Sequence, residues 1–342
     1  MKIDDYINYY KDVTLDDYKI NDLDLAIMAT LSYLPIKPFN KKKSLKTISK
    51  EIVDFKYEGM ASYSVKLIKM LVNTNRFKDI VIEEFTSIVD DKTQFGVMKI
   101  RFDNNTIFSF KGTDNSLIGW CENFRLSYMY PIYTQELAKK YLIDNTNLFD
   151  TNIYLVGHSK GGNLALSCAM ELPLKISKRV KKIVNFDGPG VLDREFNSDK
   201  YKRIEDRLIN YLPENSVIGI LMNNKNYQYI KTDGIGFMGH MMNTWNTFGS
   251  FFIESELSKT SMKLHENSVM GLKYLNPKEL EEVVETFFSV IENNGIKRFS
   301  DIKKLDKNTL ISTINDLSDI SKETKEYFME TIKIFMMPER GK

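Results

Sequence analysis

Three segments rich in apolar and β-branched residues follow one another in the first third of the chain. They span residues 80–89, 95–102 and 106–110, and two polar turns separate them, Asp90-Asp91 and Asp103-Asn104-Asn105. Segments of this composition between Asp- and Asn-rich turns are typical of consecutive β-strands. The pattern therefore predicts a β-meander.

The middle of the chain has a strand, helix, strand pattern. A helical pattern over residues 117–142 precedes the apolar run 153–156, which leads through a glycine-flanked turn into a helix-like stretch at 163–172. A second apolar run follows at 180–186. Short connections between such elements are typical of a parallel sheet with helices on both faces. The same pattern predicts two more strands, at residues 216–222 and 227–231.

Helical periodicity marks both ends of the chain. Near the start, Leu25, Met28 and Leu31 share one side of a predicted helix with Asp22 as its N-cap. Near the end, Asn276-Pro277-Lys278-Glu279 is a helix start signal, and an apolar stripe at helical spacing follows it. The stripe comprises Leu280, Val283, Val284, Phe287, Phe288 and Ile291.

These patterns divide the chain into three predicted parts. Residues 1–20 mix acidic residues with tyrosines and are predicted to form a peripheral arm. Residues 21–256 are predicted to form an α/β core, and residues 257–342 a helical C-terminal region. The apolar stripe of this region requires a packing partner, either the core of the same chain or a second copy in a homo-oligomer.

Composition and charge exclude several classes of protein. Hydrophobic residues make up 42% of the 342 residues and charged residues 27%, which excludes a disordered or collagen-like chain. Lys and Arg (48) nearly balance Asp and Glu (46), so the net charge of +2 supplies no field that would attract nucleic acid. We find no signal peptide and no apolar run long enough for an integral membrane segment, and therefore expect a cytoplasmic protein. Cys121 and Cys168 lack metal or disulfide spacing and are predicted to be reduced core thiols.

The strongest chemical signal is the turn Gly157-His158-Ser159-Lys160-Gly161, between the apolar run and the helix-like stretch. A G-x-S-x-G sequence in this context is typical of a nucleophilic serine, because flanking side chains would clash in the tight turn. We therefore predict that Ser159 is a catalytic nucleophile. The amide of Lys160 is predicted to donate to an oxyanion, since the first N–H groups of a helix lack backbone partners.

A serine nucleophile requires a base, and the sequence contains three histidines, His158, His240 and His265. His158 would point away from the hydroxyl of its neighbour, and His265 lies in the C-terminal helical region, so both are predicted to have packing roles. His240 lies in a loop after the last predicted strand, which gives the order serine, acid, histidine of α/β-hydrolases. We predict that His240 is the general base.

The sequence does not decide which group orients His240. Asp187 is preferred, because it ends the strand next to the serine strand in a turn rich in glycine and proline. Glu214 and Asp233 are alternative acids between the serine and the histidine. An amide such as Asn215 could take the same role.

A second oxyanion donor is predicted at the end of the meander, in Phe110-Lys111-Gly112-Thr113-Asp114. In acyl-transfer sites this donor comes from an early strand-to-helix loop, and a glycine there permits close approach of the backbone. Thr113 is predicted to supply the donor through its amide and hydroxyl.

These motifs resemble those of class 3 lipases. The segment 110–114 with Trp120 downstream resembles their F-R-G-T motif, with Lys111 in place of arginine. The sequence G-H-S-K-G-G-N-L-A at 157–165 is similar to their serine turn. Residues 20–250, including the Asp187-Gly188-Pro189-Gly190 turn, look more specifically like the bacterial Mbeg1-like proteins.

The resemblance implies a lipase-like α/β-hydrolase fold, with a mostly parallel central sheet flanked by helices and with a helical C-terminal extension here. It also implies that Ser159 and His240 are catalytic. The aspartate of class 3 lipases falls near Asn215 or Ser216, which leaves the acid open.

The predicted function is hydrolysis of carboxylic esters through an acyl-enzyme on the serine, with no metal and no cofactor. Small-molecule or lipid esters are the expected substrates, and Met238, Met241 and Trp245 are predicted to line an acyl pocket. Two alternatives stay open. One is a binding or scaffold protein that keeps the fold without turnover, and the other is an acyltransferase or peptidase with the same triad.

Overall fold

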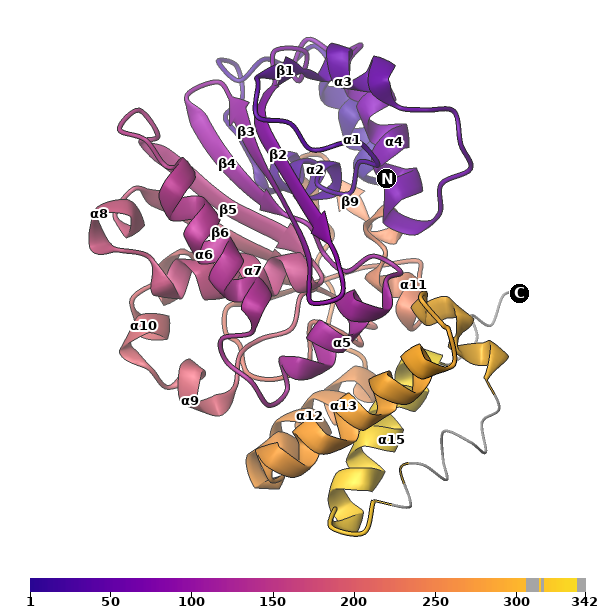
Figure 1. Ribbon diagram of the computed structural model, residues 1–342. Coiled ribbons are helices and arrows are strands. Elements are labelled where there is room, and N and C mark those ends of the chain that lie inside the picture. Colours follow the sequence, from indigo (N-terminus) through magenta and orange to yellow (C-terminus); the bar gives the residue numbers. More distant parts are fainter. Residues whose placement is uncertain (306–313, 315–316, 337–342) are drawn as a thin grey trace.

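The alternation of side chains along β3 supplies both faces of a central sheet. In this computed structural model, which describes residues 1–305, 314 and 317–336, Phe95 and Val97 contribute to one apolar core and Ile100 and Phe102 to another. Successive side chains of a strand point to opposite faces, so a strand that is apolar on both sides must be covered on both sides. The molecule is therefore layered, with helices on either side of the sheet (Figure 1).

Within the described residues, the central sheet has eight strands in the order β1 to β8. The first four strands pair antiparallel, and β4 to β8 pair parallel. The predicted meander is confirmed as β2 to β4. The strands are β1 (Lys43–Ser44), β2 (Val81–Val89), β3 (Gln94–Phe102), β4 (Asn105–Phe110), β5 (Asn152–His158), β6 (Val180–Phe186), β7 (Leu208–Pro213) and β8 (Tyr227–Ile230), and a separate pair is formed by β9 (Thr247–Phe248) and β10 (Phe251–Phe252).

Two sets of helices cover the sheet. One core contains the apolar residues of α1 (Ile3–Tyr10), α2 (Asp22–Leu31), α3 (Leu45–Glu51) and α4 (Gly59–Leu71). The other core contains those of α6 (Tyr133–Asn145) and α7 (Lys160–Glu171). Short helices in the connections are α8 (Leu174–Ser177), α9 (Asp193–Phe196), α10 (Asp199–Lys202), η1 (Glu205–Arg207), α11 (Phe237–His240) and η2 (Met242–Thr244). This mostly parallel sheet between helical layers is the predicted α/β-hydrolase fold.

The C-terminal helices pack on the core of the same chain, through α5 (Leu117–Arg125) (Figure 1). Phe124 of α5 contacts the rings of Phe288 and Phe328, and Arg125 pairs with Glu285 at 2.6 Å. The apolar stripe predicted from the sequence is buried in this interface. The helices are α12 (Lys259–Tyr274), α13 (Pro277–Asn293), η3 (Phe299–Lys304) and α15 (Lys322–Met336), while residues 306–313, 315–316 and 337–342 of the predicted region lie outside the described residues.

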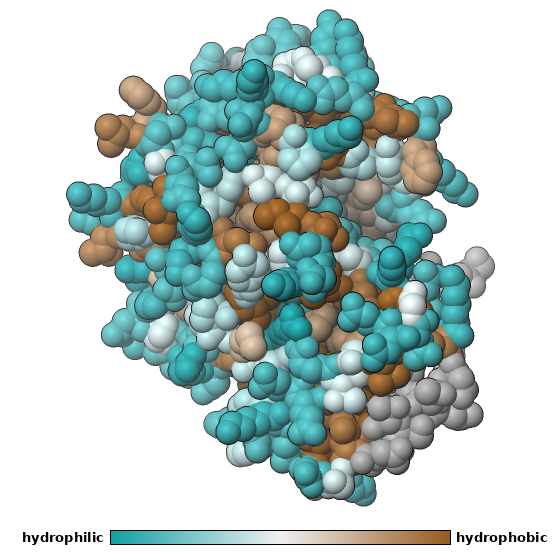
Figure 2. Space-filling view, in the orientation of Figure 1, coloured by the Kyte–Doolittle hydropathy of each residue, from teal (hydrophilic) through white to brown (hydrophobic). Residues whose placement is uncertain are grey.

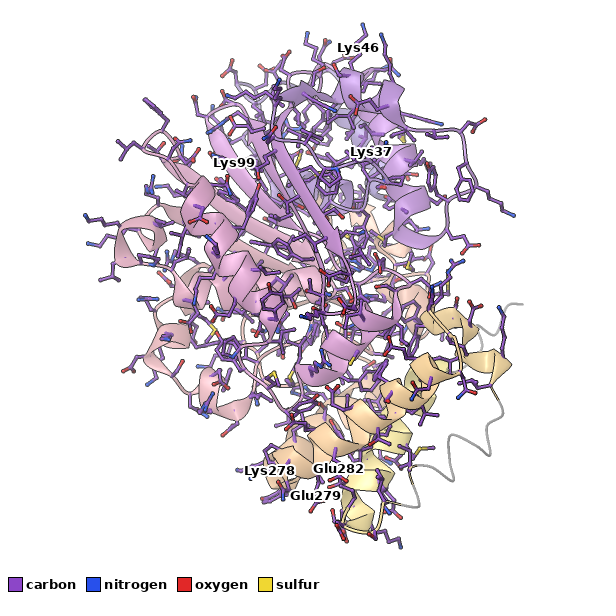
Figure 3. All side chains as sticks on the ribbon, in the orientation of Figure 1. Lys37, Lys46, Lys99, Lys278, Glu279 and Glu282 are labelled. Carbon is purple, nitrogen blue, oxygen red and sulfur yellow. The ribbon has the colours of Figure 1, made fainter. Side chains whose placement is uncertain are left out.

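Residues of the α13 start signal stabilise the first turns of two helices, α13 and α15. The side chain of Asn276 accepts a hydrogen bond from the amide of Lys278, as expected of an N-cap. Glu279 lies where α13 and α15 meet (Figure 3), and its Oε2 accepts bonds from the amide and hydroxyl of Ser321 and from the hydroxyl of Thr324. The glutamate therefore stabilises the first turn of α15, which ties the two helices together.

The helical pattern over residues 117–142 corresponds to two helices, α5 and α6, with Pro131 in the break between them. Three sequence expectations are wrong in detail. The strand predicted at 216–222 is a series of turns in which Ile218, Ile220 and Met222 are buried. The strand of this region is β7. The N-cap of α2 is Asn21 and not Asp22, since the Asn21 side chain accepts from two helix amides.

The third correction concerns residues 1–20, which are not a peripheral arm. Ile3, Tyr6 and Ile7 are fully buried and belong to the core beneath α2 and α4. Their spacing of three and four places them on one face of α1, while Asp5 is exposed and Asp4 pairs with Lys66 of α4. Among the helices of the described residues, none combines the length and apolar character of a membrane span.

A buried ion pair fixes this N-terminal segment to the core. Arg76 Nη2 lies 2.6 Å from Asp24 Oδ2, and neither side chain is exposed. Tyr6 donates its hydroxyl to Asp24 Oδ1 at 2.7 Å, and Arg76 Nη1 donates to the carbonyls of Val13 and Tyr18. A single guanidinium thus holds the residues that link α1 to α2.

We predict that Asp24→Asn lowers the free energy of unfolding by about 3–5 kcal/mol, because it leaves a buried guanidinium without its counterion. Urea denaturation measures this change. The control is Asp144→Asn, which alters the exposed Lys140–Asp144 pair and should cost about 1 kcal/mol or less. Equal effects of the two substitutions would contradict the prediction.

Candidate active site

Ser159 lies in a strained turn between β5 and α7. Its backbone has φ 59° and ψ −134°, a left-handed conformation that few non-glycine residues adopt. A Cβ on Gly157 would lie 2.1 Å from the carbonyl oxygen of Gly161, so glycine is required where the turn closes. Ser159 is 9% exposed, at the carboxyl end of the parallel strands. The local geometry is that of the predicted nucleophile turn.

Of the carboxylates left open by the sequence, the fold brings Asp187 to the histidine. His240 Nδ1 lies 2.7 Å from Asp187 Oδ2, and both side chains are buried. Asp187 follows β6 in a turn with φ 49°, and its Oδ1 accepts from Ser216 Oγ at 2.5 Å and from the Gly219 amide at 3.0 Å. Ser216, near the expected position of the class 3 aspartate, therefore holds the Asp187 carboxylate in place.

The alternative acids lie in other contacts. Glu214 accepts hydrogen bonds from Ser255 Oγ and the Thr232 amide. Asp233 has a side chain that is 66% exposed and pairs with Lys2 at 2.6 Å. Asn215 is bonded to the carbonyl of Gly234. No described contact joins any of these three residues to His240.

Burial shifts the pKa values of both His240 and Asp187. Loss of water lowers the pKa of His240, so its imidazole is neutral at neutral pH. Burial raises the pKa of Asp187, and the bonds from Ser216 and Gly219 oppose this shift by stabilising the carboxylate. A neutral His240 whose Nδ1–H donates to Asp187 has an unprotonated Nε2, which is the form that accepts a proton.

The two predicted oxyanion residues lie beside Ser159. A Cβ on Gly112 would lie 2.4 Å from the carbonyl oxygen of His158 and 3.1 Å from Ser159 Cβ, so the loop before Thr113 touches the serine turn. Thr113 Oγ1 accepts from Asn123 Nδ2 at 2.8 Å. Within the described residues, neither the Thr113 nor the Lys160 amide donates to another backbone group.

Comparison with known proteins gives a family. The family model of Mbeg1-like proteins matches residues 71–289. The chain belongs to the Mbeg1-like family. A search of curated proteins gave no match. Among solved structures, the crystal structure of M37 lipase is similar at a TM-score of 0.38 and 15% identity, over 60% of this Mbeg1-like chain and 70% of the lipase chain.

The side chain of Lys160 has a role in this Mbeg1-like protein that the sequence did not reveal. It is fully buried, its Nζ lies 2.5 Å from Glu122 Oε2, and it also donates to the carbonyl of Gln94 at 2.7 Å. Burial lowers the pKa of Lys160, and the carboxylate opposes that shift. The pair links α5 and β3 to the first residue of α7. Lys160 and Glu122 lie far apart in the sequence, and no residue next to either of them indicates that they form a pair.

The expected pocket residues near His240 divide into two kinds. Trp245 does not line a pocket, because it is fully buried, donates Nε1–H to the carbonyl of Gly239 and packs on Phe186 and Phe252. This corrects the sequence expectation. Met238 is 38% exposed and Met241 is half-buried, so both retain surface that a ligand can contact.

The third histidine and the two cysteines have structural roles. His265 donates Nδ1–H to the carbonyl of Ile220, 2.6 Å away, which is a packing role. Cys121 and Cys168 are free and buried, which confirms their prediction as core thiols. Among the residues that the structure describes, no cluster of His, Cys, Asp or Glu is suited to hold a metal ion.

His158 anchors the loop that carries His240. Its Nε2 lies 2.9 Å from the His240 carbonyl oxygen, and its Nδ1 lies 3.0 Å from the Tyr33 hydroxyl. Because a carbonyl can only accept, Nε2–H is the donor and Nδ1 accepts from the tyrosine. Burial, with a smaller contribution from His240, lowers the pKa of His158 to about 3. The neutral ring thus holds the second histidine in place, as the predicted packing role requires.

This pKa generates a prediction for stability against pH. Between the unfolded pKa of about 6.5 and the folded value near 3, the unfolded chain binds a proton at His158 that the folded protein does not. The free energy of unfolding should therefore fall on acidification, by up to about 1.4 kcal/mol per pH unit from this group. His158→Asn should make the dependence shallower between about pH 6 and pH 4.

Urea denaturation at several pH values measures these slopes. His265→Asn is the control for removal of a histidine outside the site. Identical slopes for the parent protein and His158→Asn would contradict the prediction.

Proposed function

We propose that this Mbeg1-like protein is a serine hydrolase that cleaves carboxylic esters. The observation that carries the proposal is the 2.7 Å contact between His240 Nδ1 and the buried carboxylate of Asp187. The next residue, Gly188, packs against the carbonyl of Ser159, which lies in a strained turn. A histidine oriented in this way presents a neutral Nε2, which is the base that an alcohol nucleophile requires. No other described carboxylate reaches this histidine, so the acid in the proposal is Asp187.

In the acylation step, Ser159 Oγ attacks the ester carbonyl carbon as its proton passes to His240 Nε2. The amides of Lys160 and Thr113 donate to the carbonyl oxygen as it becomes negative, and each such donor is worth about 3–4 kcal/mol. Asp187 stabilises the imidazolium. The tetrahedral intermediate collapses when the carbon–oxygen bond to the alcohol breaks, and His240 returns the proton to the leaving alkoxide. An acyl-enzyme and a free alcohol result.

In the deacylation step, His240 takes a proton from water, and the hydroxide oxygen attacks the acyl carbon. The second intermediate collapses, Ser159 regains its proton from His240, and the carboxylic acid leaves. An alcohol or amine in place of water would turn the same cycle into acyl transfer, and an amide substrate would turn it into peptide hydrolysis. Esters are the proposed substrates because the partly exposed residues near the base, Met238 and Met241, are apolar and uncharged.

The hydrolase proposal predicts that a fluorophosphonate probe labels the folded protein at Ser159. Ser159→Ala should abolish labelling, and His240→Ala should reduce it strongly. Asp187→Asn should lower kcat for a p-nitrophenyl ester by roughly 10³- to 10⁴-fold, because the imidazole loses its orientation and the stabilisation of its charge. Mass spectrometry of the labelled peptide and a spectrophotometric ester assay provide the measurements.

Glu214→Gln is the matched control, since it makes the same carboxylate-to-amide change at a residue bonded to Ser255 and not to His240. Its activity should equal that of the parent protein. If the folded parent protein took up no probe and hydrolysed no ester, the hydrolase proposal would be wrong, and a ligand-binding role for the same fold would replace it.

A further inference from the structure

The hydroxyl of Tyr33 lies between two loops of the proposed active site. Tyr33 follows α2 and is 5% exposed, and its Oη lies 3.0 Å from His158 Nδ1 and 3.2 Å from the His158 carbonyl oxygen. A Cβ on Gly112 would lie 1.9 Å from the same hydroxyl oxygen, so glycine is required where residues 111–114, the oxyanion loop, approach the tyrosine. One buried oxygen therefore contacts both the oxyanion loop and the turn that carries Ser159.

The direction of each hydrogen bond follows from the donors present. The Nε2–H of His158 donates to the His240 carbonyl at 2.9 Å, so Nδ1 of the neutral ring carries no proton and accepts from the Tyr33 hydroxyl. Burial raises the pKa of Tyr33, which keeps the hydroxyl protonated, and a hydrogen bond from the backbone of Gly112 opposes that rise. The hydroxyl thus accepts from the oxyanion loop and donates to His158.

These bonds form a chain that ends at the proposed base and acid. From the oxyanion loop it passes through Tyr33 and His158 to the backbone of His240, whose Nδ1 lies 2.7 Å from Asp187. The ring centroids of His158 and His240 lie 4.3 Å apart, so packing as well as hydrogen bonding joins the two histidines. The loop that stabilises the oxyanion and the residue that moves the proton are thus connected through protein groups.

Helix α2 gives the hydroxyl a fixed position. The amide of Tyr33 donates to the carbonyl of Thr30 at 3.1 Å, which continues the end of the helix. Ser109 Oγ of β4 donates to the carbonyl of Met28 at 2.8 Å, and the oxyanion loop follows the same strand. The tyrosine is therefore built on a helix that is bonded to the strand before the oxyanion loop, which suits a residue that sets distances in a catalytic site.

We propose that Tyr33 is a positioning residue that holds the oxyanion loop and the His240 loop at their working distance, through His158. The inference rests on the proposed ester hydrolysis and adds a residue to its machinery. Without the hydroxyl, Nδ1 of His158 and the amide of Gly112 would lose the bonds that connect them, and the two loops could shift relative to each other. A displacement of about 1 Å between catalytic groups is enough to lower the rate about 100-fold.

The substitution Tyr33→Phe tests the proposal, because it removes one oxygen atom and keeps the ring. For a p-nitrophenyl ester, kcat should fall by about 10- to 100-fold, while KM should change by about threefold or less. Loss of kcat at nearly constant KM is expected when the transition state loses its alignment and binding of the substrate is unchanged. Steady-state kinetics of the full chain measures both parameters.

Tyr63→Phe is the matched control. Tyr63 is 6% exposed, and its hydroxyl donates to Asp4 Oδ1 at 3.0 Å, where α4 meets α1. The control removes the same atom at the same degree of burial, so a general loss of packing or hydrogen bonding would affect both variants. Its kcat and KM should equal those of the parent protein. Both variants are assayed under conditions in which urea denaturation shows them to be folded.

A second pair of variants tests whether Tyr33 acts through His158. His158→Asn breaks the chain at its next member and should also lower kcat at nearly constant KM. In this background, Tyr33→Phe should lower kcat by about threefold or less, because the connection between the loops is already lost. If Tyr33→Phe does not fold, His158→Asn alone remains decisive, since an unchanged kcat there would contradict the proposal.

The outcomes separate the two proposals. If the parent protein hydrolyses esters and Tyr33→Phe has the kcat of Tyr63→Phe, the positioning role is overturned and the hydrolase proposal stands. A loss that appears in KM and not in kcat, or an equal loss of kcat with and without His158, has the same meaning. If Ser159 takes up no fluorophosphonate and no ester is hydrolysed, the hydrolase proposal fails, and the positioning role fails with it.

Discussion

The close contact of three backbone loops around Ser159 is the constraint on which the rest of the site depends. A Cβ at Gly112, Gly161 or Gly188 would lie 2.1–2.4 Å from a backbone oxygen of a neighbouring segment, which is far inside van der Waals contact. Each loop ends a strand of the sheet, so the register of β4, β5 and β6 sets their mutual distances. The positive φ of Ser159 is held by this packing and not by local sequence preference.

Helix α5 connects the loops around Ser159 to the C-terminal helices. On one side, Glu122 pairs with the buried Lys160 at the start of α7, and Asn123 holds the Thr113 hydroxyl. On the other side, Phe124 and Arg125 contact α13 and α15. Figure 2 shows mainly hydrophilic side chains on the outer face of these helices, which agrees with their apolar residues being used for packing inward. The C-terminal region is thus part of the structure that supports the site.

The residues that the sequence predicted well are those whose neighbours in the chain determine their conformation. The serine turn follows from its glycines and its position between strand and helix, and His240 follows from the small number of histidines. The sequence leaves the acid open, because the contact of Asp187 with His240 joins two loops that only the sheet brings together. It does not place Trp245 correctly, because a tryptophan near the base can face either a pocket or the core, and the hydrogen bond to Gly239 directs it to the core. The Lys160–Glu122 pair is a contact of the same long-range kind.

The extent of the family match bears on how the C-terminal helices join the core. The match over residues 71–289 includes the loops of Ser159 and His240, α5, α12 and most of α13, whereas α15 lies beyond it. Glu279 lies inside the match, and its carboxylate accepts hydrogen bonds from Ser321 and Thr324 at the start of α15. The position of α15 therefore depends on a residue of the matched region. Because the ring of Phe328 also contacts Phe124 of α5, the packing of α15 extends to the helix that follows the Thr113 loop.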